Sequence, residues 1–499
     1  MKHASKNPKV RTRFAPSPTG YLHVGGLRTA LFNYLFARHN EGVFVLRIED
    51  TDRERYVAGA VEKILQTLKE VGLGYDEGPD KDGGFGPYIQ SERLPQYQKY
   101  AADLISTGSA YYCFCTPSRL DKIREEQKRN NFPTRYDGNC RDLSQKEREK
   151  NFRAGTPFVV RFRTPRTGVT EFTDLVFGRK EFRNDLLDDT ILTKSDGYPV
   201  YNFANVIDDH LMEISHVIRG EEFISSTPKH VLLYQSFGWG LPQFAHLPLL
   251  LDQHRKKLSK RSGDVAVEEY LLKGYLKEAL LNFISLLGWN PKSKEEIFSL
   301  QELVAEFSLD HANKSGAIFD PAKLNFINRK WQQKLNLGRQ DPLYVRAVQI
   351  LQERLGQIDE NTLVAVWPQI LQRANDPYAL EKDLEEFLFY FREPQVEISL
   401  LPWKKQSPDS VKARLTLLRE YISTLQPADF EARILEQKIK KLLQSRGVPL
   451  GEALWPLRVA LTGQKNSPGP FEVMESFGKV LRKNEVIVKR IDSALAILG

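Results

Sequence analysis

The sequence predicts an α/β fold in its first half, an insertion within that fold, and a mostly helical second half. Short apolar runs alternate with helical patterns at the start, this alternation breaks over about 95–190, and helical periodicity punctuated by prolines dominates beyond about residue 265. Alternating strands and helices predict an open parallel sheet whose ligand lies at the carboxyl ends of its strands. A chain of 499 residues is too long to fold around one hydrophobic core, so we expect three to five domains.

The first ninety residues follow the order strand, helix, strand, helix. A short extended run at 10–15 is stopped by the Pro and Gly cluster at 16–20, and apolar residues then recur at helical spacing over 22–37. The apolar run 43–48 is typical of a strand buried in a parallel sheet, and 60–71 is helical again. These elements form the first half of the predicted sheet domain.

The stretch 95–190 has a different character. It holds all three cysteines, a polar and charged helix near 118–128, and strand-like runs such as 157–162. The α/β pattern resumes at 188–192 and continues through the apolar run 231–234. We therefore expect an inserted domain between two halves of one sheet domain.

The composition is that of a folded globular protein, with 41% hydrophobic and 27% charged residues. No stretch reaches the roughly 18 apolar residues of a membrane span, and the N-terminus has no secretory pattern. Three cysteines are too few for a disulfide framework in a chain of this size. We expect a cytosolic protein in a reducing compartment, with no membrane partner.

The net charge of +8 is concentrated at one end of the chain. Residues 401–499 hold 17 Lys and Arg against 10 Asp and Glu, a surplus of 7. This surplus indicates either a well-solvated helical surface or a face that binds a polyanion, and charge alone leaves both open.

The first candidate site is the strand-to-helix turn at 16–26. A helix N-terminus presents backbone N–H groups and a positive dipole end, so it attracts phosphate. Gly25 and Gly26 would let a base or ribose approach the backbone, and His23 could donate a hydrogen bond to a phosphate. A satisfied turn without a ligand is the alternative.

The second candidate site is the basic stretch 254–263. Lys257 and Lys260 flank Ser259, so this loop could close on a triphosphate and neutralise the charge that grows on departing pyrophosphate. An ordinary solvated loop is the alternative.

The two segments together resemble the paired motifs of the class I aminoacyl-tRNA synthetases. Nearly end to end, the chain resembles the bacterial-type glutamyl-tRNA synthetases, and its His-Val-Gly-Gly turn is typical of glutamate rather than glutamine enzymes. The stretches that resemble this family are 13–20, 47–52, 195–199, 205–210, 257–261 and 456–463.

This resemblance implies a Rossmann-type parallel-sheet catalytic domain with an inserted acceptor-binding domain, followed by mostly α-helical stem-contact and anticodon-binding domains. The expected boundaries are 1–94 for the first half of the catalytic domain, 95–190 for the inserted acceptor-arm domain, 191–240 for the second half, 241–330 for the stem-contact domain with the Lys-Leu-Ser-Lys-Arg loop, and 331–499 for the anticodon-binding domain.

The resemblance also implies a glutamate–tRNA ligase that uses ATP and Mg²⁺. L-glutamate would form glutamyl-adenylate with release of pyrophosphate and then pass to the 3′-terminal adenosine of tRNA(Glu); a form that also charges tRNA(Gln) is the alternative. We expect a monomer. A small-molecule nucleotidyltransferase, a non-catalytic homologue and a truncated base-modifying relative fit less well, because the chain has both phosphate motifs and a long helical C-terminal part.

The resemblance assigns individual residues. His23, Lys257 and Lys260 would be catalytic, and a planar guanidinium suits the grip on a carboxylate better than Lys does. The expected ATP-binding residues are His23, Gly25, Gly26, Glu222, Lys257, Ser259 and Lys260. The expected glutamate-binding residues are Arg13, Ala15, Ser17, Glu49, Tyr201, Asn205 and Arg219.

The insertion contains a candidate zinc site. Cys113 and Cys115 are followed by Cys140 and Asp142, a spacing that could provide four tetrahedral ligands for a structural Zn²⁺. Some members of the family have His in the last place, and Tyr136 is another candidate for the fourth ligand. A reduced cluster that packs as three small apolar residues is the alternative.

Overall fold

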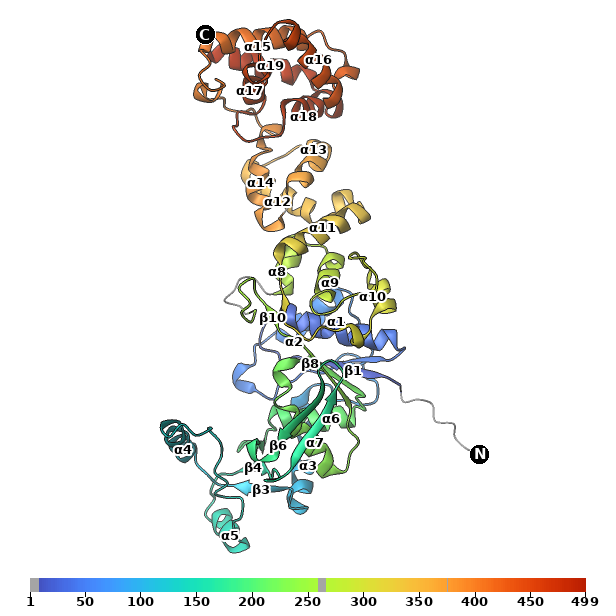
Figure 1. Cartoon of the computed structure of the whole chain (residues 1–499), viewed down its shortest axis with the longest axis vertical. Helices are drawn as coiled ribbons and strands as arrows, with labels where there is room; N and C mark the ends of the chain where they lie inside the picture. The colour runs from blue at the N-terminus through green and yellow to red at the C-terminus, as the bar shows by residue number, and fades with distance from the viewer. Residues whose placement is uncertain (1–8, 259–265, 375) are drawn as a thin grey trace, which may run out of the picture. The chain divides into compact units, whose positions relative to one another are not determined.

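The computed structural model describes residues 9–258, 266–374 and 376–499. The chain divides into two compact units (Figure 1). The first contains Met1–Leu272 and Leu276–Ile327, and the second contains Lys273–Tyr275 and Asn328–Gly499. Within the described ranges, no helix is long and apolar enough to cross a membrane. The predicted domain boundaries inside the first unit stay predictions.

Parallel strands form the centre of the first unit. Strand β1 (Arg11–Phe14) pairs in parallel with β2 (Val43–Leu46), and every residue of both strands is buried. Strand β8 (His216–Gly220) pairs in parallel with β9 (Gln243–Leu247) and lies beside β1. The predicted α/β fold with a parallel sheet is confirmed. It follows from short apolar strands that are buried on both faces.

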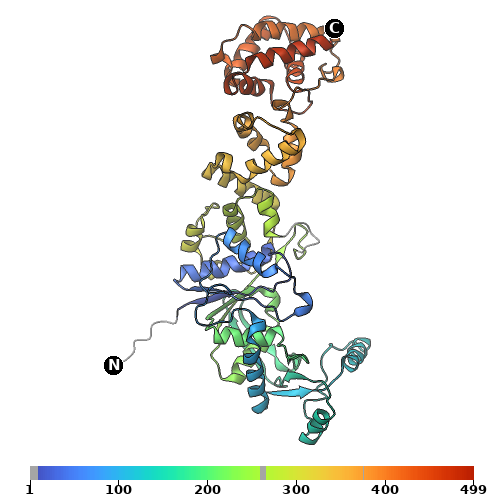
Figure 2. The ribbon, with the colours of Figure 1, turned by 180° about the vertical axis from the view of Figure 1, so that it is seen from behind.

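Helices cover both faces of these strands. Helix α1 (Val24–His39) packs on β1 and β2 and is covered in turn by α9 (Lys277–Ser285) and α10 (Leu300–Glu306). Figure 2 shows this layering from behind, with α1 in blue. Helices α6 (Tyr201–Leu211), α7 (Thr227–Phe237) and α3 (Leu94–Ser106) lie on the other side. This unit also contains α2 (Ala60–Glu70), β10 (Leu250–Leu251), α8 (Val267–Leu272) and β11 (Ala317–Ile318). Helix α11 (Pro321–Leu335) begins in the first unit and ends in the second.

The insertion forms its own antiparallel sheet and two peripheral helices. The sheet order is β3 (Ala110–Cys113), β4 (Val159–Phe162) and β7 (Ile191–Thr193), and the helices are α4 (Pro117–Arg129) and α5 (Gln145–Arg153). We expected the α/β pattern to resume at 188–192, and the strand that begins at the end of this segment, β7, belongs to the antiparallel sheet. The apolar run 231–234 lies within α7. A short apolar run by itself fits a buried helix as well as a buried strand.

A hairpin joins the insertion to the central strands. Strand β5 (Val169–Asp174) pairs antiparallel with β6 (Gly178–Arg183), and the end of β5 pairs in parallel with β9 at Asp174 and Phe244. The four-stranded sheet β6-β5-β9-β8 thus brings Asp174 next to the strands that line the candidate site.

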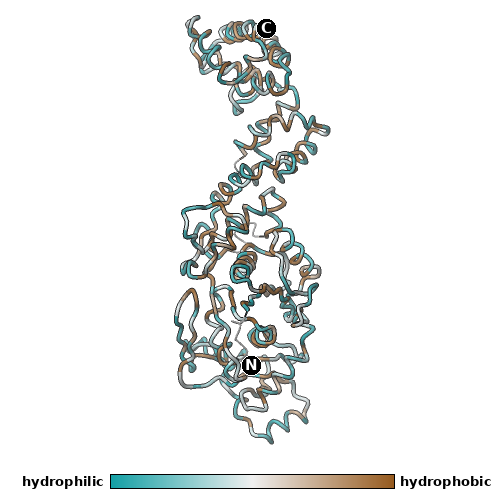
Figure 3. Tube along the Cα trace, turned by 90° about the vertical axis from the view of Figure 1, so that its right-hand side faces the viewer, coloured by the Kyte–Doolittle hydropathy of each residue, from teal (hydrophilic) through white to brown (hydrophobic). Residues whose placement is uncertain are grey.

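The second unit is helical, and its described residues share one apolar core. Its helices are α12 (Pro342–Leu355), α13 (Glu360–Arg373), α14 (Leu380–Glu385), α15 (Pro408–Ile422), α16 (Ala432–Ser445), α17 (Leu450–Thr462), α18 (Pro470–Glu475) and α19 (Asn484–Ile497). Helices α15, α17 and α19 pack against one another. Figure 3 shows apolar and polar residues alternating along these helices, as amphipathic packing requires.

Candidate functional site

A cavity of about 980 Å³ opens in the first unit where β1 and β8 end. This volume is at the upper end of the range for small-molecule sites. All the described residues that we expected to bind ATP or glutamate line it: Arg13, Ala15, Ser17, His23, Gly25, Gly26, Glu49, Tyr201, Asn205, Arg219, Glu222 and Lys257. Ser259 and Lys260 lie outside the described residues. The sheet therefore brings the two predicted residue sets into one cavity, at the edge where ligands of such sheets bind.

His23 caps the helix that points into this cavity. Its Nδ1 accepts a hydrogen bond of 3.1 Å from the backbone N–H of Gly26, so a neutral ring carries its proton on Nε2. A Cβ on Gly25 would approach the His23 ring to 3.0 Å, which is tighter than almost all real Cβ contacts. Gly25 therefore makes room for the imidazole of His23, besides any role in approaching a ligand.

Lys257 reaches the same cavity from a short hairpin. The backbone N–H of Leu258 donates to the carbonyl of Leu250, and Asp252 caps the turn by accepting hydrogen bonds from the backbone N–H groups of His254 and Lys256. This hairpin places the start of the basic stretch beside the N-terminus of α1. A cation and a positive helix end thus meet at one end of the cavity.

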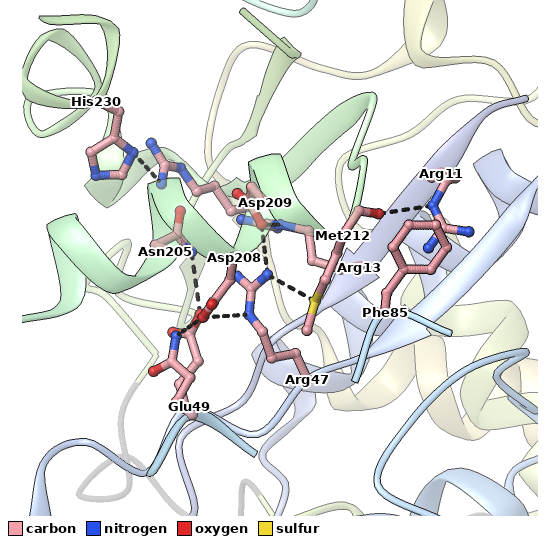
Figure 4. A network of polar contacts seen from close by, with 12 residues as sticks. Arg11, Arg13, Arg47, Glu49, Phe85, Asn205, Asp208, Asp209, Met212 and His230 are labelled. Carbon is pink, nitrogen blue, oxygen red and sulfur yellow. Dashed lines mark hydrogen bonds and ion pairs between the residues drawn. The ribbon is translucent and has the colours of Figure 1, made fainter. Parts of the chain in front are cut away.

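A buried network of charges lies at the other end (Figure 4). Arg13 Nε donates to Asp209 at 3.0 Å, and Arg47 donates to Asp209 at 2.8 Å and to Glu49 at 3.1 Å. Asn205 Nδ2 also donates to Glu49, at 3.2 Å. Helix α6 supplies both Asn205 and Asp209, which are four residues apart and so share a helix face. The network positions Arg13 and Glu49 at the cavity wall.

Burial and mutual attraction shift the pKa values of this network in different directions. Burial raises the pKa of Glu49, and the nearby guanidinium groups of Arg47 and Arg13 only partly offset this. For Asp209 burial acts the same way, but Arg13 and Arg47 dominate and hold the pKa below its ordinary value. The pKa of Arg47 is raised well above its usual range, because its carboxylate partners outweigh its complete burial.

Arg219 differs from the other buried arginines in its partners. Its Nε donates to His246 Nε2 at 3.2 Å, its Nη2 donates to Thr227 Oγ1 at 2.9 Å, and its Nη1 lies 3.3 Å from His230 Nδ1 and 3.4 Å from the Tyr201 hydroxyl. Among the described residues, no carboxylate lies within ion-pair distance of Arg219. Burial lowers the pKa of Arg219, whose side chain nevertheless stays a cation at neutral pH.

The cavity thus has cationic groups at both ends, and the carboxylates Glu49 and Glu222 are among its lining residues. The N-terminus of α1, His23 and Lys257 suit phosphates, whereas Arg13 and Arg219 suit carboxylates and Glu49 suits an ammonium group. Such an arrangement can hold an amino acid with its α-carboxylate directed toward a nucleotide.

Sequence reasoning missed the residues that hold these groups in place. They are Arg47, Thr227, Asp208, Asp209, His230, His246 and Asp174. One signal was available, namely charged or imidazole side chains within buried strands and helices, since such groups are rarely buried without a partner. Their partners lie far away in the sequence, so the pairs could not be assigned.

The three cysteines form one cluster in the insertion. Their sulfur atoms lie within 4.8 Å of one another, and Cys115 Sγ is 3.5 Å from Cys140 Sγ. The Tyr136 hydroxyl lies 3.3 Å from Cys113 Sγ and 3.6 Å from Cys115 Sγ. The structure does not bring Asp142 into this cluster, because its side chain is 79% exposed and pairs with Arg163 at 2.9 Å. Three thiols and a phenol are a donor set that a zinc ion can use.

Comparisons with known proteins agree in both units. A family model described as tRNA synthetases class I (E and Q), catalytic domain, matches residues 9–326, and one described as anticodon binding domain matches residues 343–495. A glutamate–tRNA ligase of Clostridium novyi is 45% identical, covering 98% of this chain and 99% of its own length. One of Clostridium acetobutylicum is 43% identical, covering 97% and 99%.

Solved structures show the same similarity. A crystal structure of a glutamate tRNA ligase from Elizabethkingia meningosepticum in complex with its amino acid has a TM-score of 0.85 and 36% identity, covering 98% of this chain and 100% of that one. A glutamate–tRNA synthetase structure from Elizabethkingia anophelis has a TM-score of 0.84 and 35% identity, with the same coverage.

Proposed function

The chain belongs to the class I tRNA synthetases for glutamate and glutamine, and from this premise we propose that it ligates L-glutamate to tRNA at the expense of ATP. It is an aminoacyl-tRNA synthetase whose relatives over nearly the full length are named for glutamate. One observation supports the substrate most directly, namely a cavity that joins a phosphate-receiving helix end to two buried guanidinium groups.

The reaction we propose has two half-reactions. An α-carboxylate oxygen of glutamate attacks the α-phosphorus of ATP, the bond from that phosphorus to the bridging oxygen breaks, and pyrophosphate leaves with the electron pair. A ribose hydroxyl of the terminal adenosine of tRNA then attacks the glutamyl carbonyl, loses its proton, and displaces AMP. Neither step needs a covalent bond to the protein, so positioning and electrostatic stabilisation supply the rate.

At the phosphate end we propose that His23 and Lys257, which both lie in the described part of the chain, are catalytic. Donors aimed at oxygens that gain charge stabilise the transition state more than the ground state. His23 carries its proton on Nε2, because Nδ1 accepts from Gly26, and this tautomer suits a phosphate oxygen. Lys260 stays a prediction from the sequence. Mg²⁺ would enter with ATP and supply positive charge that offsets part of the charge on its phosphates.

At the amino-acid end we propose that Arg219 and Arg13 bind substrate carboxylates and that Glu49 binds the ammonium group. The position of Glu49 supports this role, because Arg47 and Asn205 hold its carboxylate at the cavity wall. The side-chain carboxylate of glutamate would meet Arg219, whose charge has no anionic partner among the described residues. Glutamine would leave that buried charge unpaired, which is costly.

We also propose that Cys113, Cys115, Cys140 and Tyr136 hold one structural zinc ion. The three sulfur atoms lie within 4.8 Å of one another and the Tyr136 hydroxyl lies 3.3 Å from Cys113 Sγ, whereas the exposed carboxylate of Asp142 pairs with Arg163. A bound zinc would join the end of β3 to the loop before α5 and so stiffen the insertion.

For tRNA, we propose that the helical second unit contacts the anticodon arm, as its family model suggests. The basic surplus of residues 401–499 supports phosphate contacts there. The names of the relatives do not favour the alternative in which tRNA(Gln) is charged as well. A monomer and a cytosolic location stay predictions from the sequence.

The test is ATP–pyrophosphate exchange with glutamate, ATP and tRNA present. We expect exchange with glutamate, and a loss on the order of 100-fold in Lys257→Ala and in His23→Ala, because each group acts on developing charge. Lys256→Ala is the matched control, since Lys256 precedes Lys257 in the same hairpin but does not line the cavity. An equal loss in Lys256→Ala, or a parallel loss of tRNA binding in the two site variants, would contradict the assignment.

A further inference from the structure

Arg219 is held by a chain of side chains that begins outside the cavity. In the parallel pair β8 and β9, Arg219 lies directly opposite His246, so both side chains project from the same face of the sheet. Strand β5 then places Asp174 beside His246, because Asp174 pairs with Phe244 of β9. Asp174 thus contacts His246, and His246 contacts Arg219, so the contacts cross three neighbouring strands.

Both side-chain oxygens of Asp174 accept hydrogen bonds. Its Oδ1 accepts hydrogen bonds from the backbone N–H groups of Val176 at 3.0 Å and Phe177 at 2.8 Å. Its Oδ2 accepts from the backbone N–H of His246 at 3.1 Å and lies 2.6 Å from His246 Nδ1. A carboxylate has no hydrogen to donate, so it can only accept from the ring nitrogen that faces it. Nδ1 of His246 must therefore carry a proton.

The opposite ring nitrogen of His246 then faces Arg219 as a lone pair. His246 Nε2 lies 3.2 Å from Arg219 Nε, which always carries a hydrogen. The same Nε2 lies 3.2 Å from Thr227 Oγ1, whose hydroxyl donates to the carbonyl of Phe223. A proton on Nε2 would oppose Arg219 Nε–H, so a neutral ring with its proton on Nδ1 is the state that fits both the Arg219 contact and the Asp174 contact. Asp174 thus determines, through the position of the proton on the ring, whether His246 can accept a hydrogen bond from Arg219.

His230 presents a second lone pair in the same way. Its Nε2 lies 2.9 Å from Asn202 Oδ1, which leaves Nδ1 as the acceptor toward Arg219 Nη1. Within the described ranges, the acceptors of Arg219 are therefore all neutral, and they include Thr227 Oγ1 and the Tyr201 hydroxyl. By contrast, Arg13 donates to the carboxylate of Asp209. The guanidinium of Arg219 is oriented without its charge being neutralised.

We propose that Asp174 is a positioning residue for the selection of glutamate, acting on Arg219 through the tautomer of His246. This proposal rests on the proposed function, because it concerns the group that would meet the substrate's side-chain carboxylate. A carboxylate in direct contact with Arg219 would orient it equally well but would compete with that substrate group. Placing the carboxylate behind a neutral imidazole orients the guanidinium and leaves its charge available.

The first test is Asp174→Asn. Its Oδ1 can keep the hydrogen bonds from Val176 and Phe177, so the amide nitrogen would face His246 Nδ1 and donate to it. The amide nitrogen would also face the backbone N–H of residue 246, which donates to Oδ2 in the wild type, and this second loss is the same in the His246→Gln background used below. The ring proton would then move to Nε2 and oppose Arg219 Nε–H. We expect the KM for glutamate in pyrophosphate exchange to rise on the order of 10- to 100-fold, the effect of a lost hydrogen bond to a charged group. The KM for ATP should stay within about 2-fold of wild type.

The second test separates this role from a merely structural one. In His246→Gln, the amide oxygen can take the place of Nε2 as an acceptor, and it has no tautomer for Asp174 to control. If Asp174 acts through His246, then Asp174→Asn should change the KM for glutamate little in the His246→Gln background. A general structural defect would cause the same loss in both backgrounds, and this result would overturn the proposal.

A third comparison keeps the proposal testable if Asp174→Asn folds poorly. His246→Leu removes the acceptor that His246→Gln retains, so its KM for glutamate should be about 10-fold higher than that of His246→Gln. Equal KM values in these two variants would overturn the proposal. Exchange by the wild type is measured first, because a wild type that does not activate glutamate refutes the proposed function and not the role of Asp174.

Discussion

Replacing Arg219 by Gln removes the charge that we propose selects glutamate over glutamine. Arg219 is 4% exposed, and its partners among the described residues are neutral, so the variant leaves no buried carboxylate without a partner. The loss should therefore appear in substrate binding more than in folding. Truncating one partner of a buried charge pair costs about 2–5 kcal/mol, which corresponds to roughly 30- to 5000-fold in kcat/KM for glutamate.

The assay is pyrophosphate exchange in the presence of tRNA, with glutamate and glutamine measured separately on each protein. In Arg219→Gln, kcat/KM for glutamate should fall by that factor while the value for glutamine changes little, so the preference shrinks toward parity. Arg219→Lys is the matched variant: it keeps the charge but loses the planar fork, so it should retain a preference for glutamate at a lower rate. If Arg219→Gln keeps the full preference, Arg219 does not select the substrate.

Three further results are expected. Burial raises the pKa of Glu49, so its carboxylate becomes protonated at a higher pH than that of an exposed Glu. The KM for glutamate should therefore rise as the pH falls through that pKa, and Glu49→Gln should abolish this pH dependence. Metal analysis should find about one zinc per chain. Tyr136→Phe should bind zinc more weakly, and Asp142→Asn should bind it as the wild type does. Protein that is prepared without chelators and contains no zinc argues against the site. A chain ending at Leu335, which keeps α11 whole, should bind tRNA more weakly and with a flatter salt dependence, since fewer counterions are released. An unchanged slope would mean that the basic surplus is a solvated surface.

Local patterns in the sequence predicted the central elements closely. The apolar run 43–48 became the buried strand Val43–Leu46, and the helical spacing over 22–37 became the helix Val24–His39. These predictions succeed because a strand that is buried on both faces has a continuous apolar run, and a helix that covers a sheet has apolar residues at every third or fourth position. His23 was found for a similar reason, since the cap of a helix depends on residues that are adjacent in the chain.

Pairings between distant segments were not predicted. The segment 188–192 joins an antiparallel sheet through residues near 160, and β5 joins the central strands through a single residue pair with β9. Strand propensity does not specify a partner, and a short apolar run fits a helix equally well, as the position of residues 231–234 within α7 demonstrates.

The sequence by itself determined the family resemblance, the α/β order of the first elements, and the residue types that a nucleotide and an amino acid would need. The tertiary structure alone decided which charges are neutralised. Arg13 meets Asp209 across 196 positions of the chain, whereas the partners of Arg219 in the described part of the chain are neutral, and one of them, His246, contacts Asp174 of strand β5. Whether a buried cation remains available to a substrate depends on which acceptors lie within about 3 Å of it, and in a folded chain those acceptors come from segments that no local pattern connects.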